Sequence, residues 1–342
     1  MKRNKLSKVF TIAALSLVVG GSSAFAAVTT DGKWASRYNT LTVSLSSANT
    51  TAWTSGAAKW YNNTNFKLSS TLGSVSNYFA TDTYVENAQW DGVTYSTILD
   101  PSGTIINSES YLNTWAFTQR VYSAAQKAAV AAHEIGHSFG LNEASNVESS
   151  SIMWPYSFNS SGQFVKVLNP SSTDISVVNS LYPALALKSK TAEPNSVISS
   201  GEKTVHLHPN WAVYYKDDNE LADAADLVIQ GIVKEDLGSN IDNKGAYYSY
   251  YTDVSLEVIK VIKGDPAENQ KVIRVSQMGG SDGSVNVVSE GSTKLLKDQE
   301  VTLFLKKLND ERYIPINEDE SIFVNAGGEF LNTANGGSLN IQ

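Results

Sequence analysis

The most constraining feature of the chain is a pair of histidines, His133 and His137, separated by Glu-Ile-Gly. Residues four apart lie on the same face of an α-helix, so both rings can bind a single metal ion. The carboxylate of Glu134 can then reach a water molecule on that ion. Gly140 allows the helix to end and the chain to turn back, which brings Glu143 towards the metal. Two imidazoles and a third ligand leave one open position on zinc, as in hydrolytic zinc sites.

The wider pattern is His-Glu-x-x-His-x-x-Gly-x-x-Glu over residues 133–143, followed by Met153 in Ser-Ile-Met-Trp-Pro-Tyr. It resembles the metzincin clan of zinc endopeptidases, and most nearly the matrixins and their small bacterial relatives. The resemblance covers about residues 30–184. It implies an α+β domain with a twisted sheet, an active-site helix and a C-terminal helix.

The resemblance also implies a role for each residue of the motif. His133, His137 and Glu143 are the expected zinc ligands. Glu134 is the expected general base, which takes a proton from the zinc-bound water and later passes it to the leaving amine. Matrixins usually have histidine at the position of Glu143, or aspartate in some small bacterial members. Glutamate is an acceptable zinc ligand, but its charge should make the bound water a weaker acid.

Further positions follow from the same resemblance. Met153 is expected to form the apolar floor beneath the zinc. Tyr156 is a candidate hydrogen-bond donor to the oxyanion, although it lies one residue further from the methionine than in other metzincins. Matrixins commonly hold structural calcium, for which Asp82, Asp91 and Asp100 are the candidate carboxylates.

Two more histidines, His206 and His208, stand two residues apart on a predicted strand and therefore share a face. They leave three roles open. In the first, one of the two supplies the third zinc ligand. In the second, the pair blocks the site across a domain interface. In the third, both are ordinary surface or interface residues.

The N-terminus predicts export. Residues 1–26 combine a basic start, an apolar run over residues 9–20 and a final Ala-Phe-Ala, which is typical of a secretory signal peptide. The apolar run is too short for a membrane anchor. Cysteine is absent, which suits an exported bacterial protein without disulfides and excludes a thiolate zinc ligand. We therefore expect a secreted, extracellular, bacterial protein with no membrane attachment after the signal is removed.

Charge divides the chain into two parts. The formal net charge is −8, and removal of the four basic residues of the signal leaves −12, which argues against nucleic-acid binding. Residues 27–188 carry 8 basic and 10 acidic residues, whereas residues 189–342 carry 14 and 24. We expect a peptidase domain over 27–184, a linker over 185–202 and a separate all-β domain over 203–342, for which a small barrel is the candidate architecture.

Hydrophobic periodicity gives the elements. Helices are expected over about 51–61 and 123–139, and a third begins after a Ser/Thr cap near residue 171. The extended segment 104–113 is expected to be the edge strand beside which matrixins bind peptide. Strands in the second part are predicted from apolar or alternating runs at residues 227–233, 252–258, 272–275 and 301–305.

These features predict a secreted zinc endopeptidase that cleaves an extended peptide of an extracellular protein. The all-β domain is expected to bind substrate, a cell surface or the catalytic domain. Two alternatives remain open. One is a secreted binding or surface protein whose peptidase domain has lost catalysis. The other is a peptidase inhibited by its own C-terminal domain.

Overall fold

The structure is a computed structural model that describes residues 30–74, 76–145, 148–184, 203–244, 247–281, 283, 285–308 and 311–341. The predicted signal peptide and the predicted linker lie outside the described residues. Within the described part of the chain, no helix is both long and apolar enough to cross a membrane.

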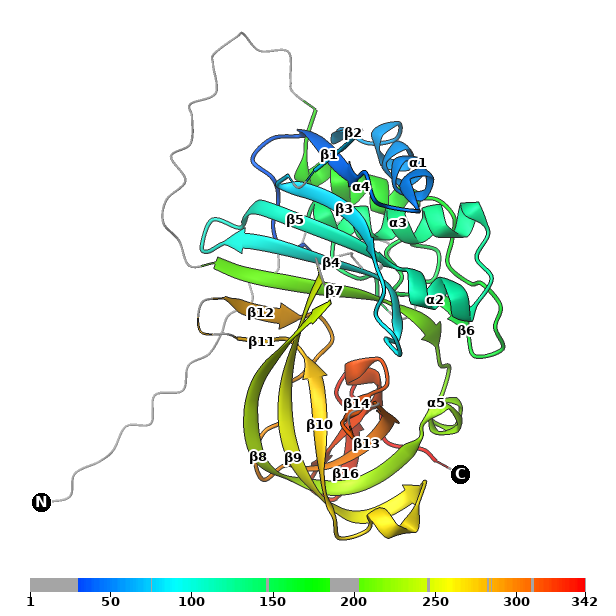
Figure 1. The fold of residues 1–342 in the computed structure, drawn as a ribbon, viewed down its shortest axis with the longest axis vertical. Coiled ribbons are helices and arrows are strands. Elements are labelled where there is room, and N and C mark those ends of the chain that lie inside the picture. The colour runs from blue at the N-terminus through cyan, green and yellow to red at the C-terminus, as the bar shows by residue number, and fades with distance from the viewer. Residues whose placement is uncertain are drawn as a thin grey trace, which may run out of the picture.

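The chain up to residue 184 contributes the helices and most strands of a first sheet. Its elements are β1 (Tyr38–Ser44), α1 (Thr50–Tyr61), β2 (Lys67–Gly73), β3 (Tyr78–Thr83), β4 (Trp90–Leu99), β5 (Thr104–Asn113), α2 (Thr114–Gln119), α3 (Ala124–Ser138), β6 (Tyr156–Asn159) and α4 (Ser172–Leu181). β1 runs parallel to β2 and β3, β3 runs parallel to β5, and β4 runs antiparallel to β5. Figure 1 shows α1, α3 and α4 on one side of this sheet.

Local signals explain the helix ends, and the predicted helices are confirmed by α1, α3 and α4. α3 starts at a capping box, in which the Ser123 oxygen accepts from the Gln126 amide and the Gln126 side chain accepts from the Ser123 amide. α4 starts in the same way with Ser171 and Asp174. These reciprocal bonds satisfy amides that have no partner within the helix.

A hydrophobic core lies between the helices and the sheet. The alanine-rich centre of α3 is fully buried, and its small side chains permit close approach of α1. The indole of Trp60 on α1 donates to the carbonyl of Ala132 on α3, at 2.7 Å. The largest buried side chains of this core include Trp53, Trp60, Phe66, Tyr78 and Phe139. α3 is therefore held firmly in one position against the sheet.

The structure corrects the predicted edge strand. Residues 104–113 do form a strand, β5, but β5 is paired on both sides, with β3 and with β4. The first five strands have the order β4-β5-β3-β1-β2, so β4, and not β5, lies at one edge of this group. The prediction was wrong because both segments alternate, and alternation does not show which of two neighbouring strands has a second partner.

The outer edge of β4 is covered by β7 (Lys203–Tyr214), which runs antiparallel to it. The free side of β7 is shared by β12 (Asn286–Ser289) along its first half and β6 along its second, both parallel to it. The first sheet therefore has the order β11-β12-β7-β4-β5-β3-β1-β2, with β6 also on β7. Residues 203–214 are thus part of the same sheet as the helical half of the molecule.

The rest of the chain forms a second sheet with little helix. Its elements are α5 (Asp218–Ala224), β8 (Leu227–Lys244), β9 (Tyr247–Lys263), β10 (Val272–Met278), β11 (Gly280–Ser281), β13 (Glu300–Lys307), β14 (Tyr313–Pro315), β15 (Ile322–Ala326) and β16 (Glu329–Asn332), with β11 joining the first sheet. Short 3₁₀ turns occur at Pro266–Glu268 and Glu318–Ser321. β14 pairs with both β10 and β13, so β14, β10, β9, β8 and β13 close into a ring. This closure is what the predicted small barrel requires, while a separate domain over 203–342 stays a prediction.

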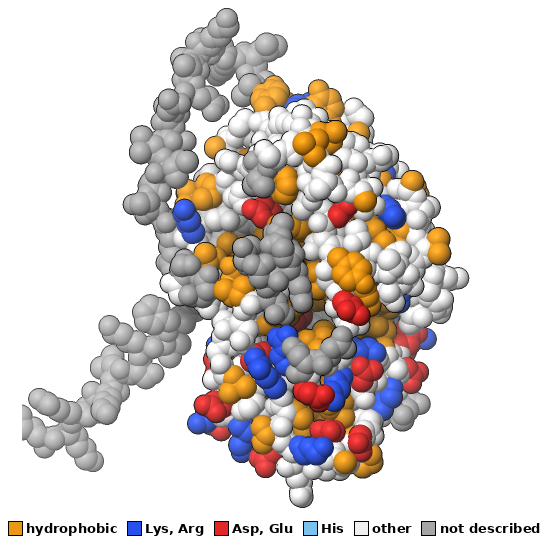
Figure 2. All heavy atoms as spheres, viewed as in Figure 1, with side chains coloured by type: hydrophobic (Ala, Val, Ile, Leu, Met, Phe, Trp, Pro, Cys, Tyr) orange, Lys and Arg blue, Asp and Glu red, His pale blue; other side chains and the backbone are white. Residues whose placement is uncertain are grey.

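An apolar cluster on the other face of the first sheet joins the two halves. It contains Val93 of β4, Leu207 and Trp211 of β7 and Trp154 before β6, with Tyr250 and Met278 of the second sheet packed against it. Figure 2 shows that charged side chains gather over the lower half, which holds the second sheet, while the upper half is mostly uncharged. The uneven acidity of the sequence therefore follows the two halves of the fold.

Candidate metal centre

α3 places the two motif histidines one turn apart on the same face. Nε2 of His133 and Nε2 of His137 lie 2.9 Å apart, and both side chains are buried. The other ring nitrogens contact backbone carbonyls, His133 Nδ1 at 2.8 Å from Ile152 O and His137 Nδ1 at 2.7 Å from Leu141 O. A carbonyl only accepts, so each Nδ1 carries the proton. Both Nε2 atoms of the neutral rings therefore present lone pairs to the same point.

Burial favours the neutral form of both rings. It lowers the pKa of His133 well below its usual value. Burial, together with the neighbouring His208, lowers the pKa of His137 to about 3. Two neutral rings with facing lone pairs cannot hydrogen-bond to each other through those atoms.

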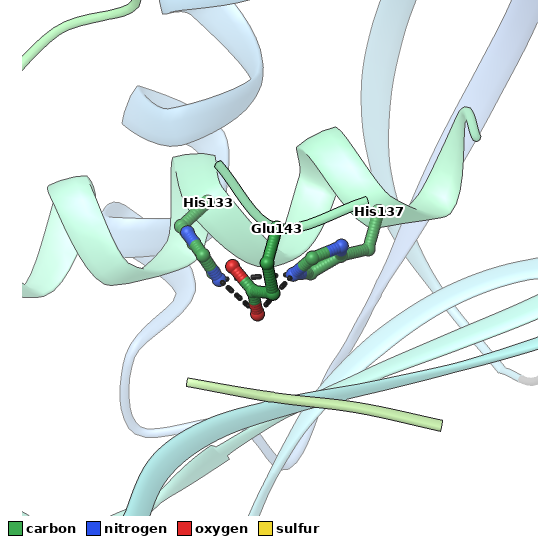
Figure 3. A group of neighbouring side chains, drawn as sticks. All are labelled: His133, His137 and Glu143. Atoms are coloured by element: carbon green, nitrogen blue, oxygen red, sulfur yellow. Dashed lines mark hydrogen bonds and ion pairs between the residues drawn. The ribbon is translucent and has the colours of Figure 1, made fainter. Parts of the chain in front are cut away.

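Gly140 turns the chain back towards the histidines, as the sequence predicts. Its φ is +103°, which favours glycine, and its amide bonds to the His137 carbonyl at 2.9 Å. A Cβ at this position would lie 1.9 Å from the carbonyl oxygen of Gly32. After the turn, Oε1 of Glu143 lies 3.4 Å from His133 Nε2 and 3.2 Å from His137 Nε2 (Figure 3).

The three side chains fit a divalent cation. Both carboxylate oxygens of Glu143 are buried and accept no hydrogen bond from the described residues. Burial, and then the charge of Glu290, raise the pKa of Glu143 well above its usual value. When Glu143 is ionised, these three electron-pair donors meet without a proton donor, which is costly unless a cation lies among them. Two imidazoles and one carboxylate are a donor set that zinc accepts.

Glu134 lies between α3 and β4. Its Oε2 accepts from Thr94 Oγ1 of β4 at 2.7 Å, and its Oε1 is buried and accepts no hydrogen bond from any residue that the structure describes. Burial raises the pKa of Glu134 well above its usual value. Sequence reasoning did not single out Thr94, because a threonine in a strand carries no signal for a catalytic environment.

Met153 lies in a tight turn next to the histidine helix. Its side chain is fully buried, and a Cβ added to Gly136 between the two histidines would lie 2.3 Å from its sulfur. Asp174 of α4 holds this turn, since its carboxylate accepts from the Ser151 hydroxyl and from the Ile152 amide at 3.0 Å. Asp174, which also belongs to the capping box of α4, thus has a second role that the sequence does not reveal.

Tyr156 lies on β6, directly opposite Trp211 of β7, and its side chain is buried. Its ring contacts those of Trp154 and Tyr214, each with centroids 5.0 Å apart. The role of Tyr156 as a donor to an oxyanion stays a prediction, because β7 covers this part of the site.

Lys166 is a buried cation beside the centre that sequence reasoning missed. Its Nζ lies 3.2 Å from His133 Nδ1 and donates to Ile152 O at 3.2 Å and to Trp154 O. Burial lowers its pKa to about 8. The charges of the buried carboxylates around the site, that of Glu143 most strongly, oppose this lowering of the pKa. A lone lysine in a loop gives no sequence signal of such an environment.

Of the two second-half histidines, His208 reaches the centre. It is buried, and its ring stacks on His137 with centroids 4.5 Å apart and planes 11° apart. Its Nδ1 contacts Glu290 Oε2 at 2.7 Å, and Glu290 also accepts from the Glu143 amide at 3.2 Å. Ligand atoms of His137, His208 and Glu290 lie within 4.8 Å of one another, as do those of the first group. His206 instead pairs with Asp31 at 3.0 Å near the surface.

The three aspartates considered for calcium lie apart from these groups. Asp91 is buried and accepts from Tyr122 and from Asn210. Asp82 accepts from the Asn49 amide, and Asp100 from Thr204. Neither group of candidate metal ligands among the described residues includes any of the three. Structural calcium stays a prediction.

Comparison with known proteins supports the resemblance. The model of the matrixin family matches residues 50–183, a span that contains α1, the histidine helix, the methionine turn and α4. This part of the chain is a matrixin-like metzincin domain, and the family is one of zinc metallopeptidases. A search of curated proteins found no match to the chain.

Proposed function

We propose that this matrixin-like protein is a secreted zinc endopeptidase that hydrolyses peptide bonds of extracellular proteins. The observation that carries the proposal is the convergence of His133, His137 and Glu143 on one point. Their facing atoms are all electron-pair donors within 3.4 Å of each other, and the Glu143 oxygens accept no hydrogen bond from the described residues. This is the environment that a divalent cation stabilises.

The residues of the chain divide the chemistry among them. His133, His137 and Glu143 would hold zinc, which when bound polarises a scissile carbonyl and lowers the pKa of water. Thr94 orients Glu134 by donating to Oε2, while Oε1 has no hydrogen-bond partner in the described part of the chain. Glu134 then takes the proton of the attacking water and delivers it to the leaving amine nitrogen.

The shape of the first sheet supports an extended peptide as the substrate. A peptide that adds to a sheet edge gains main-chain hydrogen bonds along its length. The outer edge of β4, which β7 covers in this structure, runs directly beside Glu134, through Thr94. Export is proposed from residues 1–26 alone, which lie outside the described part of the chain.

The test uses the full mature chain, residues 27–342, with an unfolded, fluorescently labelled casein as the substrate. We expect slow cleavage that a chelator removes and zinc restores. The Glu134→Ala variant should keep one zinc per chain and lose cleavage. Equal cleavage by the wild type and this variant, at equal zinc content, would refute the assigned mechanism.

A binding protein of the same fold is the second candidate. It is favoured by one observation: Glu143 stands where matrixins usually have a histidine. This candidate predicts bound zinc without cleavage, even when the site is open to peptide. Zinc content alone therefore does not separate the two candidates, whereas the Glu134→Ala comparison does.

A further inference from the structure

β7 lies where an added peptide strand would lie. It pairs antiparallel with β4 from Lys203, opposite Leu99, to Trp211, opposite Trp90. On its other side, β6 runs parallel to it from Tyr156, opposite Trp211. β7 therefore occupies the position of an added strand along β4, and its second half also lies beside β6.

The middle of β7 passes over the catalytic residues. Thr94, which holds Glu134, is directly opposite His208. The ring of His208 covers one face of the His137 ring, and Glu290 joins His208 to the backbone of Glu143. A bound substrate would have to place its own backbone where this strand lies.

The two faces of β7 hold it in different ways. The face towards α3 is polar: His206 pairs with Asp31, and Asn210 donates to Asp91 and, at 3.0 Å, to Ser157. The opposite face carries Leu207 and Trp211, both buried in the cluster that joins the two halves. Removal of apolar side chains from that face weakens docking without touching the proposed zinc ligands or Glu134.

We propose that β7 is an inhibitory strand that occupies the peptide groove of the full-length chain, so that the enzyme is latent until β7 is displaced. This inference rests on the proposed function, because it concerns access to the same site. The apparent affinity for peptide falls in proportion to the fraction of chains in which the groove is open. Changes that favour displacement of β7 must therefore raise peptide affinity and cleavage together.

Two opposite sets of variants test this in the full-length protein. Leu207→Ser/Trp211→Ser should open the groove, and Asp31→Ala is a milder opening variant should the first fold poorly. The locking pair is Thr97→Cys/Val205→Cys, because these residues are directly opposite on β4 and β7 and the chain has no other cysteine. Each single cysteine variant is the matched control.

The first readout is binding rather than catalysis. A fluorescein-labelled peptide with the sequence of residues 203–214 is titrated into zinc-loaded chains that carry Glu134→Ala, and anisotropy is measured. We expect the opened variants to bind at least about tenfold more tightly than the unopened chain. Oxidation of the locking pair in the opened background should abolish this gain, and reduction should restore it. Equal binding by locked and reduced chains would overturn the proposal.

The second readout is cleavage of labelled casein with Glu134 intact. Opened chains that bind the peptide but cleave nothing would support the inhibitory position of β7 and refute the proposed peptidase. Chains that cleave equally well when locked and when reduced would support the peptidase and overturn latency. Cleavage that appears only in opened, reduced chains supports both.

Discussion

The ring of His208 lies parallel to the ring of His137, with centroids 4.5 Å apart. His137 belongs to the helix of the metal centre, and His208 belongs to a strand that arrives from the second half of the chain. The proposed metal binding and the docking of β7 therefore share one contact, and we expect a change in either one to affect the other.

Glu143→Gln should weaken zinc binding. The substitution keeps the shape of the side chain and removes the negative charge from a donor set of two neutral imidazoles. We expect a loss of more than about 100-fold in affinity, since even partners outside the ligand set cost 10–100-fold. Competition with a chromophoric chelator measures it. Glu148→Gln, at a carboxylate outside both metal-ligand groups, is the control and should leave affinity unchanged.

Gly140→Ala should destabilise the fold more than Gly162→Ala. Both glycines have positive φ, so both substitutions strain the backbone by about 1–2 kcal/mol. Only at Gly140 would the new Cβ also meet another backbone, the carbonyl of Gly32 at 1.9 Å, whereas the space around Gly162 is open. The total cost at Gly140 should exceed about 3 kcal/mol. Urea unfolding of the two variants gives the difference, and equal losses would show that the turn relaxes.

Asp174→Asn should loosen the methionine turn. The carboxylate accepts from donors on Ser151, Ile152 and Ser171, and an amide nitrogen in place of one oxygen leaves a donor unpaired. The expected loss is about 1–3 kcal/mol in the free energy of unfolding. Asp223→Asn, at an exposed aspartate, should change stability by less than about 0.5 kcal/mol. Similar stability of both variants would exclude this role for Asp174.

His206 should make strand docking sensitive to pH. The hydrogen bond that His206 donates to Asp31 raises the pKa of His206 above 6.5, supported by the charges of Asp31, Asp100 and Glu290 and opposed by burial. The stabilisation is therefore complete below the unfolded-state pKa of 6.5 and is lost as pH rises through the higher folded-state value. We expect the thermal midpoint of the wild type to fall more steeply above about pH 6.5 than that of His206→Asn. Parallel curves would contradict this.

Asp31 contributes to stability in a different, acidic range of pH. Burial raises its pKa, but the hydrogen bonds and charges of His206, His208 and Asn142 outweigh this and lower the pKa to about 2. Its stabilisation is present above the unfolded value of 3.8 and is lost as pH falls towards about 2. His206 therefore governs the change in stability near neutral pH, and Asp31 governs the change at acidic pH.

The local parts of the structure were predictable from sequence because their determinants are local. The spacing of His133 and His137 places both rings on one helical face, and Gly140 supplies the positive φ that returns Glu143. Ser123 and Ser171 cap their helices by accepting hydrogen bonds from amides only three residues further along the chain. These features follow from periodicity and capping alone.

The contacts that close the site were not predictable in the same way. His208 and Lys166 meet the centre through tertiary packing, and neither has a motif around it. The alternation of β7 shows which side chains share a face, but not which strand it joins, so its pairing with β4 was not foreseen. Blockage of the site by the second half was only one of the alternatives left open by the sequence, and the pairing of β7 with β4 is the observation on which we base the proposal of latency.

The most direct test of the account compares Leu207→Ser/Trp211→Ser with and without Glu134→Ala, with zinc content and casein cleavage measured on the same samples. The account predicts one zinc per chain in both proteins and cleavage only where Glu134 is present. Chains that contain no zinc, or equal cleavage by both proteins, would contradict it.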